Sequence, residues 1–256
     1  MSRVHEQQLE SARARIVIEE PLEMRLDGKS VAVTMRTPDH DVELVAGFMI
    51  SEGIVSDSEG LVAIAHCDQN RNVIDVSTAA DARVRPPSPR NFFASSSCGV
   101  CGKASIDEVR QLVPDVTADA VQVSHRAMSG LPDLMRKQQN LFDETGSLHA
   151  AGLFSRDGKL LCLREDVGRH NAVDKVIGWA ALSGRLPLEG HVMLVSGRIG
   201  FEIAQKALMA RIPVLAGISG PSSLAVDLAS ESGMTLIAFL RGPDMTVCSG
   251  LERIGV

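Results

Sequence analysis

The most reactive side chains of this sequence are two cysteines separated by two residues. Cys98 and Cys101 lie in the segment SSSCGVCGK. A thiolate attacks electrophiles and carries sulfur, whereas a neutral thiol does so poorly. The helix start predicted directly behind the pair and the positive charge of Lys103 both favour the thiolate. The pattern therefore predicts either a persulfide carrier or a dithiol redox pair.

Three other interpretations of the cysteine pair stay open at this point. A zinc site needs four ligands, and without a second CxxC it would have to recruit groups such as Cys162, His149 or His170. A thioredoxin-like CxxC belongs near a βαβ unit, whereas this one follows a long segment rich in Pro and Ser. The cysteines could also be inert. A disulfide framework is not expected, because the chain has five cysteines and no secretory signal.

A second group of polar residues falls at a predicted helix start in LREDVGRHNAVDKVIG. If Asp166 caps this helix, Arg169 and His170 lie in its first turn. The helix amides and the arginine would then form an anion site. An exposed lattice of ion pairs explains the same residues. In LFDETGSLHAAGL, His149 precedes an apolar strand, and a turn with a capping or core histidine is the alternative to a site.

Three predicted strands end in small, hydroxyl or arginine residues. The residues concerned are Ser196, Gly197 and Arg198 after HVMLV, Ser219 and Ser222 after IPVLAGI, and Arg241 and Gly242 after AFL. Ligands bind at the carboxyl ends of strands in open α/β sheets. Neither a Walker A motif nor GxGxxG is present. The three ends predict an anionic, nucleotide-like ligand, although helix capping alone would explain the serines.

The first part of the chain, residues 12–115, is predicted to be a small α+β domain that ends in a flexible loop bearing the cysteines. Its expected elements are strands over 16–18, 22–26 and 31–35 with an Asp27-Gly28 turn, a helix from Pro38-Asp39, and strands over 61–65 and 73–76. Residues 79–97 are rich in Pro, Ser and Arg and cannot form regular structure. A helix is expected over 105–113, with a capping box.

The second part, residues 116–256, is predicted to be an α/β domain. Its expected elements are a helix over 124–139, a hairpin over 150–165, helices over 167–182, 199–209 and 221–229, and strands over 191–196, 212–218 and 234–240. Short apolar strands separated by helices of about ten residues indicate a parallel or mixed sheet that is buried on both faces.

Composition excludes several classes of protein. Of the 256 residues, 45% are apolar and 23% are charged, which is typical of a globular chain. The net charge of −6 gives no support for nucleic-acid binding. No apolar stretch approaches the roughly 20 residues that a membrane span needs. The start, MSRVHEQQLESARARIVIEE, lacks the apolar region of a secretory signal, so a cytoplasmic protein is expected.

Together, these segments closely resemble the FdhD family of formate dehydrogenase accessory sulfurtransferases. The matching stretches are SSCGVCGK, LHAAGL, REDVGRHNAVDKVIG, SGRIGFEIAQKA, IPVLAGIS, PSSLAVDLA and GMTLIAFLRG. They cover most of residues 95–245, whereas the first 90 residues match more loosely. The resemblance is specific because it extends over many separate motifs rather than one.

The resemblance implies a sulfur relay. A cysteine desulfurase would load a persulfide onto Cys98, with Cys101 as its partner. The sulfur would then pass to the molybdenum bis(molybdopterin guanine dinucleotide) cofactor, bound as substrate, for a client formate dehydrogenase. The implied cofactor contacts near the C-terminus are Phe239, Leu240, Arg241, Gly242, Pro243 and Asp244. The resemblance does not identify the client, distinguish molybdenum from tungsten, or say whether one cysteine or both are essential.

The family also implies a fold and an assembly. We expect a small N-terminal domain and a cytidine-deaminase-like, three-layer α/β domain with a mixed sheet, assembled as a homodimer. The deaminase zinc signature H-x-E and P-C-x-x-C is missing, so neither deamination nor a resident metal is carried over. A rival function from another class is a chaperone, which would bind the cofactor and the dehydrogenase without transferring sulfur.

Overall fold

The computed structural model describes residues 2–5, 8–11, 14–85 and 113–255. Cys98 and Cys101, and nearly all of the helix predicted over 105–113, lie outside the described residues. The predicted domain boundary at 115/116 follows directly after the longest gap and stays a prediction. None of the helices within the described ranges combines the length and the apolar character needed to cross a membrane.

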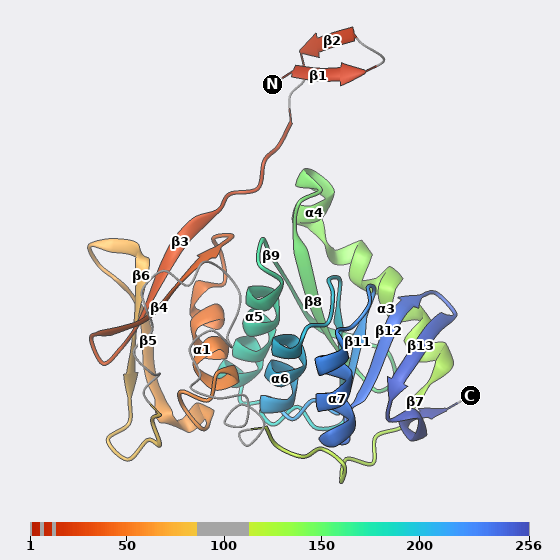
Figure 1. Cartoon of the computed structure of the whole chain (residues 1–256). Helices are drawn as coiled ribbons and strands as arrows, with labels where there is room; N and C mark the ends of the chain where they lie inside the picture. Colours follow the sequence, from red (N-terminus) through yellow and green to blue (C-terminus); the bar gives the residue numbers. More distant parts are fainter. Residues whose placement is uncertain (1, 6–7, 12–13, 86–112, 256) are drawn as a thin grey trace.

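The N-terminal part is a four-stranded sheet with one helix packed on it (Figure 1). Its strand order is β4-β3-β6-β5. The bounds are β3 Glu20–Leu26, β4 Lys29–Arg36, α1 Asp41–Ser51, β5 Leu61–Cys67 and β6 Asn70–Thr78. A short 3-10 turn, η1 Ser58–Gly60, precedes β5, and near the N-terminus β1 Ser2–His5 pairs with β2 Gln8–Ser11.

The predicted hairpin is present, but the predicted strand over 16–18 is wrong. Asp27 and Gly28 form the turn between β3 and β4, and both have positive φ angles, 46° and 76°. β3 begins only at Glu20. Ile16 and Ile18 are 63% and 60% exposed and belong to no strand. Their apolar alternation resembles that of a strand, but no neighbouring strand pairs with it.

The C-terminal part contains a six-stranded mixed sheet, as predicted. Its order is β13-β12-β11-β10-β8-β9. The bounds are β8 His149–Ser155, β9 Leu160–Asp166, β10 His191–Val195, β11 Val214–Gly217, β12 Thr235–Arg241 and β13 Asp244–Ser249. β10, β11 and β12 are parallel, whereas β8, β9 and β13 pair antiparallel to their neighbours. The parallel strands are short and apolar because both faces of this sheet are covered.

Helices cover both faces of the six-stranded sheet, which confirms the three-layer α/β prediction (Figure 1). Alternate sheet residues pack against α3 on one face and against α5, α6 and α7 on the other. The bounds are α3 His125–Gln138, α4 Asn140–Thr145, α5 Arg169–Leu182, α6 Phe201–Met209 and α7 Ser223–Glu231. Near the C-terminus, η3 Leu251–Arg253 leads into β14 Ile254–Gly255, which pairs with β7 Val123–Ser124.

The two parts meet where α1 crosses α5. A Cβ atom on Gly47 of α1 would overlap the backbone carbonyl of Asp174 in α5. A Cβ atom on Gly178 of α5 would overlap the backbone carbonyl of Glu43 in α1. The two helices therefore touch backbone to backbone, which is possible only because both positions are glycine.

Buried ion pairs surround this helix crossing. Lys206 of α6 extends its Nζ to within 2.9 Å of Asp174 Oδ2 and of Glu52 Oε1 at the end of α1. It also donates to Ser51 Oγ at 2.9 Å. All of these side chains are buried. Because a buried charge without a partner is strongly destabilising, this cluster fixes α6 relative to α1 and α5.

A further ion pair links α1 to the edge of the six-stranded sheet. Arg164 of β9 donates to both carboxylate oxygens of Glu43, at 2.5 and 2.8 Å. Burial alone would raise the pKa of Glu43, but the hydrogen bonds from Arg164 and His40 outweigh it and lower this pKa to about 2. The carboxylate therefore stays charged and paired at any pH near neutrality.

The helix crossing generates a stability prediction. Gly178→Ala is expected to lower the free energy of unfolding by about 1–3 kcal/mol or more, because the new methyl group forces the two backbones apart. Gly130→Ala in α3 is the matched control. A Cβ there meets nothing within 4 Å, so the higher helix propensity of Ala should leave stability unchanged or slightly higher. Urea unfolding measures both, and equal midpoints for the two variants would contradict the close contact.

Candidate functional site

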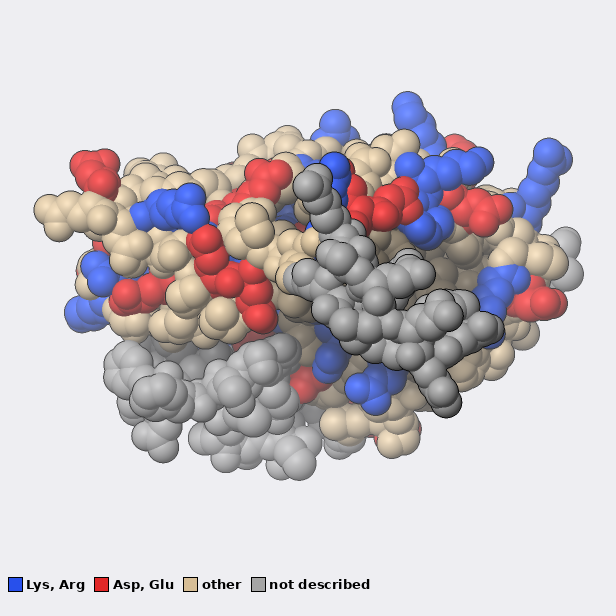
Figure 2. All heavy atoms as spheres, turned by 90° about the horizontal axis from the view of Figure 1, so that it is seen from above, with Lys and Arg blue, Asp and Glu red and all other residues tan. Residues whose placement is uncertain are grey.

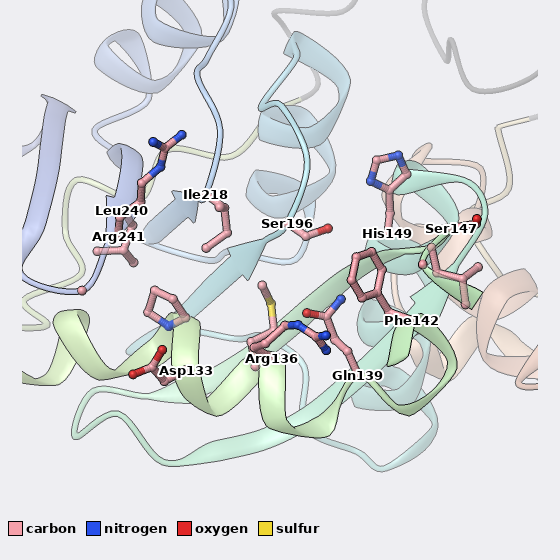
Figure 3. A pocket seen from close by; sticks show the side chains of 15 residues that line it. Asp133, Arg136, Gln139, Phe142, Ser147, His149, Ser196, Ile218, Leu240 and Arg241 are labelled. Atoms are coloured by element: carbon pink, nitrogen blue, oxygen red, sulfur yellow. The ribbon is translucent and has the colours of Figure 1, made fainter. Parts of the chain in front are cut away.

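A pocket of about 770 Å³ lies at the edge of the sheet where β10, β11 and β12 end (Figure 3). The lining residues from these strand ends are Ser196, Ile218, Leu240, Arg241 and Gly242. Because β8 runs antiparallel to β10, its beginning lies at the same edge and contributes Gly146, Ser147, Leu148 and His149. The predicted convergence of strand ends is thus confirmed for β10, β11 and β12.

One side of α3 forms the opposite wall of the pocket. The lining residues from this helix and the position after it are Pro132, Asp133, Met135, Arg136 and Gln139. Figure 3 shows Asp133, Arg136 and Gln139 in a row along this wall. These three residues were not among those predicted from the sequence. Their spacing of three places them on one face of the helix. This polar face was the signal in the sequence that could have identified them as lining residues.

The short helix α4 closes one end of this wall through Phe142. The carboxylate of Glu165 in β9 accepts hydrogen bonds from the amides of Leu141 and Phe142, at 3.0 and 2.8 Å. The guanidinium carbon of Arg136 lies 4.8 Å from the centre of the Phe142 ring. Arg136 also pairs with Asp143 at 2.5 Å. Phe142 is therefore held in place by backbone capping on one side and by a cation–π contact on the other.

His149 lies at the end of the pocket opposite Arg241 (Figure 3). Burial lowers the pKa of His149, and the neighbouring positive charges of Arg169 and His170 lower it further. The ring fits there because Gly197 has no side chain. A Cβ atom on Gly197 would lie 3.3 Å from His149 Nδ1. The imidazole of His149 is therefore neutral at neutral pH. Because it is only half-buried and lines the pocket, it is not the core histidine that the sequence left as an alternative.

Arg169 and His170 occupy the first turn of α5, as predicted, but Asp166 does not cap this helix. The N-cap is Gly168, and no side chain caps it. Asp166 is fully buried and pairs with Lys175 Nζ at 2.7 Å. Its Oδ1 also accepts the Gly168 amide at 2.8 Å. The lysine, nine positions further along the chain, draws the carboxylate away from the cap position.

The side chains of Arg169 and His170 are incompletely satisfied within the described part of the chain. His170 is 4% exposed, and neither of its ring nitrogens has a hydrogen-bond partner there. The buried Nε of Arg169 also lacks one. The nearest carboxylate oxygen to His170 Nε2 is Oε2 of Glu202, at 3.9 Å, which is too long for a hydrogen bond.

Of the site residues predicted at the ends of β10 and β11, one lines the pocket and the rest do not. Ser196 lines the pocket, and its Oγ accepts the amide of Ala150 at 2.9 Å. Arg198 is exposed and is not part of the lining. Ser222 caps α7 by accepting the amide of Ala225 at 3.3 Å, so capping explains it. The carbonyl of Ser219 accepts the amide of Phe239 at 3.3 Å.

The predicted stretch from Phe239 to Asp244 forms the end of β12, the following turn and the start of β13. Leu240, Arg241 and Gly242 line the pocket, whereas the other three do not. Phe239 has a left-handed backbone, with φ at 52°, and its 48% exposed ring packs over Gly220. The carbonyl of Pro243 lies 2.7 Å from Nε2 of His125, which joins this turn to the start of α3.

Two of the three cysteines within the described ranges are poor candidates for sulfur chemistry. Burial raises the pKa of the Cys162 thiol to about 12, and burial also raises that of Cys248. Cys67 is half-buried. Within residues 14–85 and 113–255, no group of three or more His, Cys, Asp or Glu side chains is arranged to hold a metal ion. Cys98 and Cys101, for which the sequence predicts thiolate character, therefore remain the candidates for sulfur chemistry.

Comparisons with known proteins give one consistent result. The profile of the FdhD/NarQ family matches residues 17–255. Proteins named sulfur carrier protein FdhD from Streptomyces coelicolor and Mycobacterium tuberculosis are 51% and 49% identical over 251 and 253 residues. These alignments cover 94% and 93% of this chain and 89% and 91% of the relatives. A Desulfotalea psychrophila protein, provisionally assigned as a formate dehydrogenase accessory protein, has a crystal structure that superposes on this chain with a TM-score of 0.80. The two sequences are 25% identical, and the superposition covers 99% of this chain and 96% of that one.

The charges around His149 generate a titration prediction. Arg169→Met is expected to raise the pKa of His149 towards its ordinary value of 6.5, because it removes a repelling positive charge. Arg156→Met, on the exposed turn between β8 and β9, should leave this pKa unchanged. NMR titration of the imidazole resonances measures both, and equal pKa values in the parent and the Arg169 variant would contradict the arrangement.

The same titration fixes the sign of one contribution to stability. The pKa of His149 is lower in the folded chain than in the unfolded chain, so the unfolded chain binds more protons as the pH falls through 6.5. The contribution of this group is therefore fully present above that pH and is lost on acidification. Arg169→Met should weaken this dependence.

Proposed function

The chain belongs to the FdhD/NarQ family, and from this membership we propose that it is a sulfur carrier that serves a formate dehydrogenase. The observation that carries the proposal is the identity of about half of all residues, over nearly the whole chain, with proteins named as sulfur carriers. The cysteine pair supplies the chemistry that such a role needs, and the pocket supplies a place for an acceptor.

The relay begins at the Cys98 thiolate. It receives the outer sulfur of a persulfide held by a cysteine desulfurase, and a Cys98 persulfide forms. The Cys101 thiolate then attacks the inner sulfur, so that a Cys98–Cys101 disulfide forms as the bond to the outer sulfur breaks. The outer sulfur leaves with that electron pair as sulfide, and the two cysteines supply its two electrons. The acceptor is the metal of the molybdenum bis(molybdopterin guanine dinucleotide) cofactor, bound as substrate.

The pocket suits one nucleotide arm of this cofactor. Its volume of about 770 Å³ is within the range of small-molecule sites, roughly 300–1,000 Å³. Arg241 brings positive charge for phosphate groups, and the Phe142 ring, held by its contact with Arg136, offers an apolar face for a base. The carboxylate of Asp133 can accept hydrogen bonds from the N–H groups of guanine. The whole cofactor is larger than this volume, so its remainder would extend over the neighbouring surface.

That surface does not suit a nucleic-acid partner. Figure 2 shows acidic and basic side chains interspersed among the described residues on the face seen from above. Together with the net charge of −6, this pattern favours a small ligand bound by a few placed charges over a polyanion bound along a basic stripe. The homodimer stays a prediction from the resemblance, and the cytoplasmic location stays a prediction from the sequence.

A cofactor chaperone without sulfur transfer is the second candidate. The observation that favours it is that none of the described residues lining the pocket is a cysteine. A chaperone needs the pocket but not the thiols. The two functions therefore differ in what happens when the cysteines are replaced while the pocket is left intact.

The relay generates a mass prediction. After incubation with a cysteine desulfurase and cysteine, the full chain is expected to gain one sulfur, about 32 Da, which a reductant removes. Cys98→Ala should abolish the gain, whereas Cys67→Ala, a half-buried cysteine on β5, should retain it. Intact-mass spectrometry checks this. If the parent gains no sulfur and the Cys98 variant still yields active dehydrogenase, the chaperone is the correct function.

The pocket generates a binding prediction. Arg241→Met is expected to weaken the binding of guanosine diphosphate about tenfold or more, because a charge-assisted hydrogen bond is worth about 1.5–3 kcal/mol. Arg211→Met is the control, since Arg211 is exposed and its contact is with Glu189, away from the pocket. Isothermal titration calorimetry measures both affinities. An unchanged affinity in the Arg241 variant would remove this residue from the cofactor site.

A further inference from the structure

We infer that His149, Arg169 and His170 form a subsite for a phosphate-type oxyanion at the N-terminus of α5, at the end of the pocket opposite Arg241. The inference rests on the proposed function only for the source of the anion, which would be a phosphate of the bound cofactor. The subsite itself is argued from unsatisfied polar atoms, helix geometry and local charge.

The first observation is a set of buried polar atoms without partners. Both ring nitrogens of His170 and the Nε of Arg169 are buried and have no hydrogen-bond partner within the described part of the chain. His170 as a whole is 4% exposed. Buried polar groups in native proteins are almost always satisfied, so each exception calls for a water, an ion or a ligand. These three unpartnered nitrogen atoms belong to two consecutive residues, Arg169 and His170, in the first turn of α5.

The second observation is the helix start itself. α5 has 14 residues, and its first intrahelical hydrogen bond runs from the Ala172 amide to the Gly168 carbonyl, at 3.1 Å. The amides of Arg169, His170 and Asn171 therefore have no acceptor within the helix. No side chain caps this end, and its first turn carries no acidic residue. Such an end attracts anions through its free amides and its dipole.

The third observation places His149 in the same group. A Cβ atom on Gly197 would lie 3.3 Å from His149 Nδ1 and 3.6 Å from Arg169 Cδ, so both side chains flank this glycine. Burial lowers the pKa of His149, and the charges of Arg169 and His170 lower it further against the opposing charge of Asp166, so these side chains lie close enough to interact. His149 lines the pocket and connects it to the helix start.

Two acidic groups lie near these side chains. Asp166 already pairs with Lys175 and accepts from Asn171 Nδ2 at 2.8 Å. Glu202, at the start of α6, faces His170 from 3.9 Å, beyond hydrogen-bond distance. The donors available at this helix start are two imidazoles, one guanidinium and the first amides of α5. A tetrahedral anion with several oxygens matches such donors better than a planar carboxylate does.

Histidine NMR on the full chain tests the subsite, because all seven histidines can be followed at once. Inorganic phosphate is expected to shift the His149 and His170 resonances together and saturably. Guanosine diphosphate should do the same, whereas guanosine should leave His170 unchanged. If the diphosphate displaces inorganic phosphate, the nucleotide is the source of the anion, and if both bind together, the subsite takes a free oxyanion.

Variants then separate the subsite from a general salt effect. Arg169→Met is expected to weaken phosphate binding about tenfold or more, whereas Arg211→Met should leave it unchanged. Thermal unfolding checks that the Arg169 variant is folded. The inference is overturned if phosphate shifts neither His149 nor His170, if the half-buried His191 shifts equally, or if the response survives Arg169→Met in folded protein. Sulfur loading of Cys98 is measured separately, so either result can fail without the other.

Discussion

The direct contact between the backbones of α1 and α5 is the constraint on which the rest of the structure depends. α5 packs on β8 and β9 between α1 and α6, and its first turn carries Arg169 and His170. Any change in the distance between α1 and α5 would move this turn relative to the strand ends. The position of the site therefore depends on two glycines that are distant from it, Gly47 and Gly178.

The ion pairs around this contact favour one arrangement of the two parts over others. Each joins different elements: Lys206 joins α6 to α5 and α1, Arg164 joins β9 to α1, and Lys175 joins α5 to β9. Buried pairs add little net stability, because desolvation offsets their attraction, but breaking one leaves a charge without a partner. A displaced α5 would break several pairs at once, so the arrangement is specific even where the net gain in stability is small.

The sequence predicted those features that depend on local pattern. VMLV and LIAFL are continuous apolar runs, so the strands and their common edge could be inferred, and the cysteine pair was found by residue type and spacing alone. Features that depend on distant partners were missed or wrong. The face of α3 that lines the pocket follows from its packing on the sheet, and the role of Asp166 follows from Lys175. Ile16 and Ile18 alternate as in a strand but have no strand beside them.

The contact between the two helices also limits how this chain can vary. Every single-base change in a glycine codon that alters the amino acid introduces a residue with a Cβ atom. At Gly47 or Gly178 that atom would lie within the backbone of the facing helix. A substitution at either position cannot be compensated by trimming a neighbouring side chain, because the obstacle is main chain. The surfaces and loops of the two parts can therefore change independently, whereas the helix crossing requires glycine at both positions.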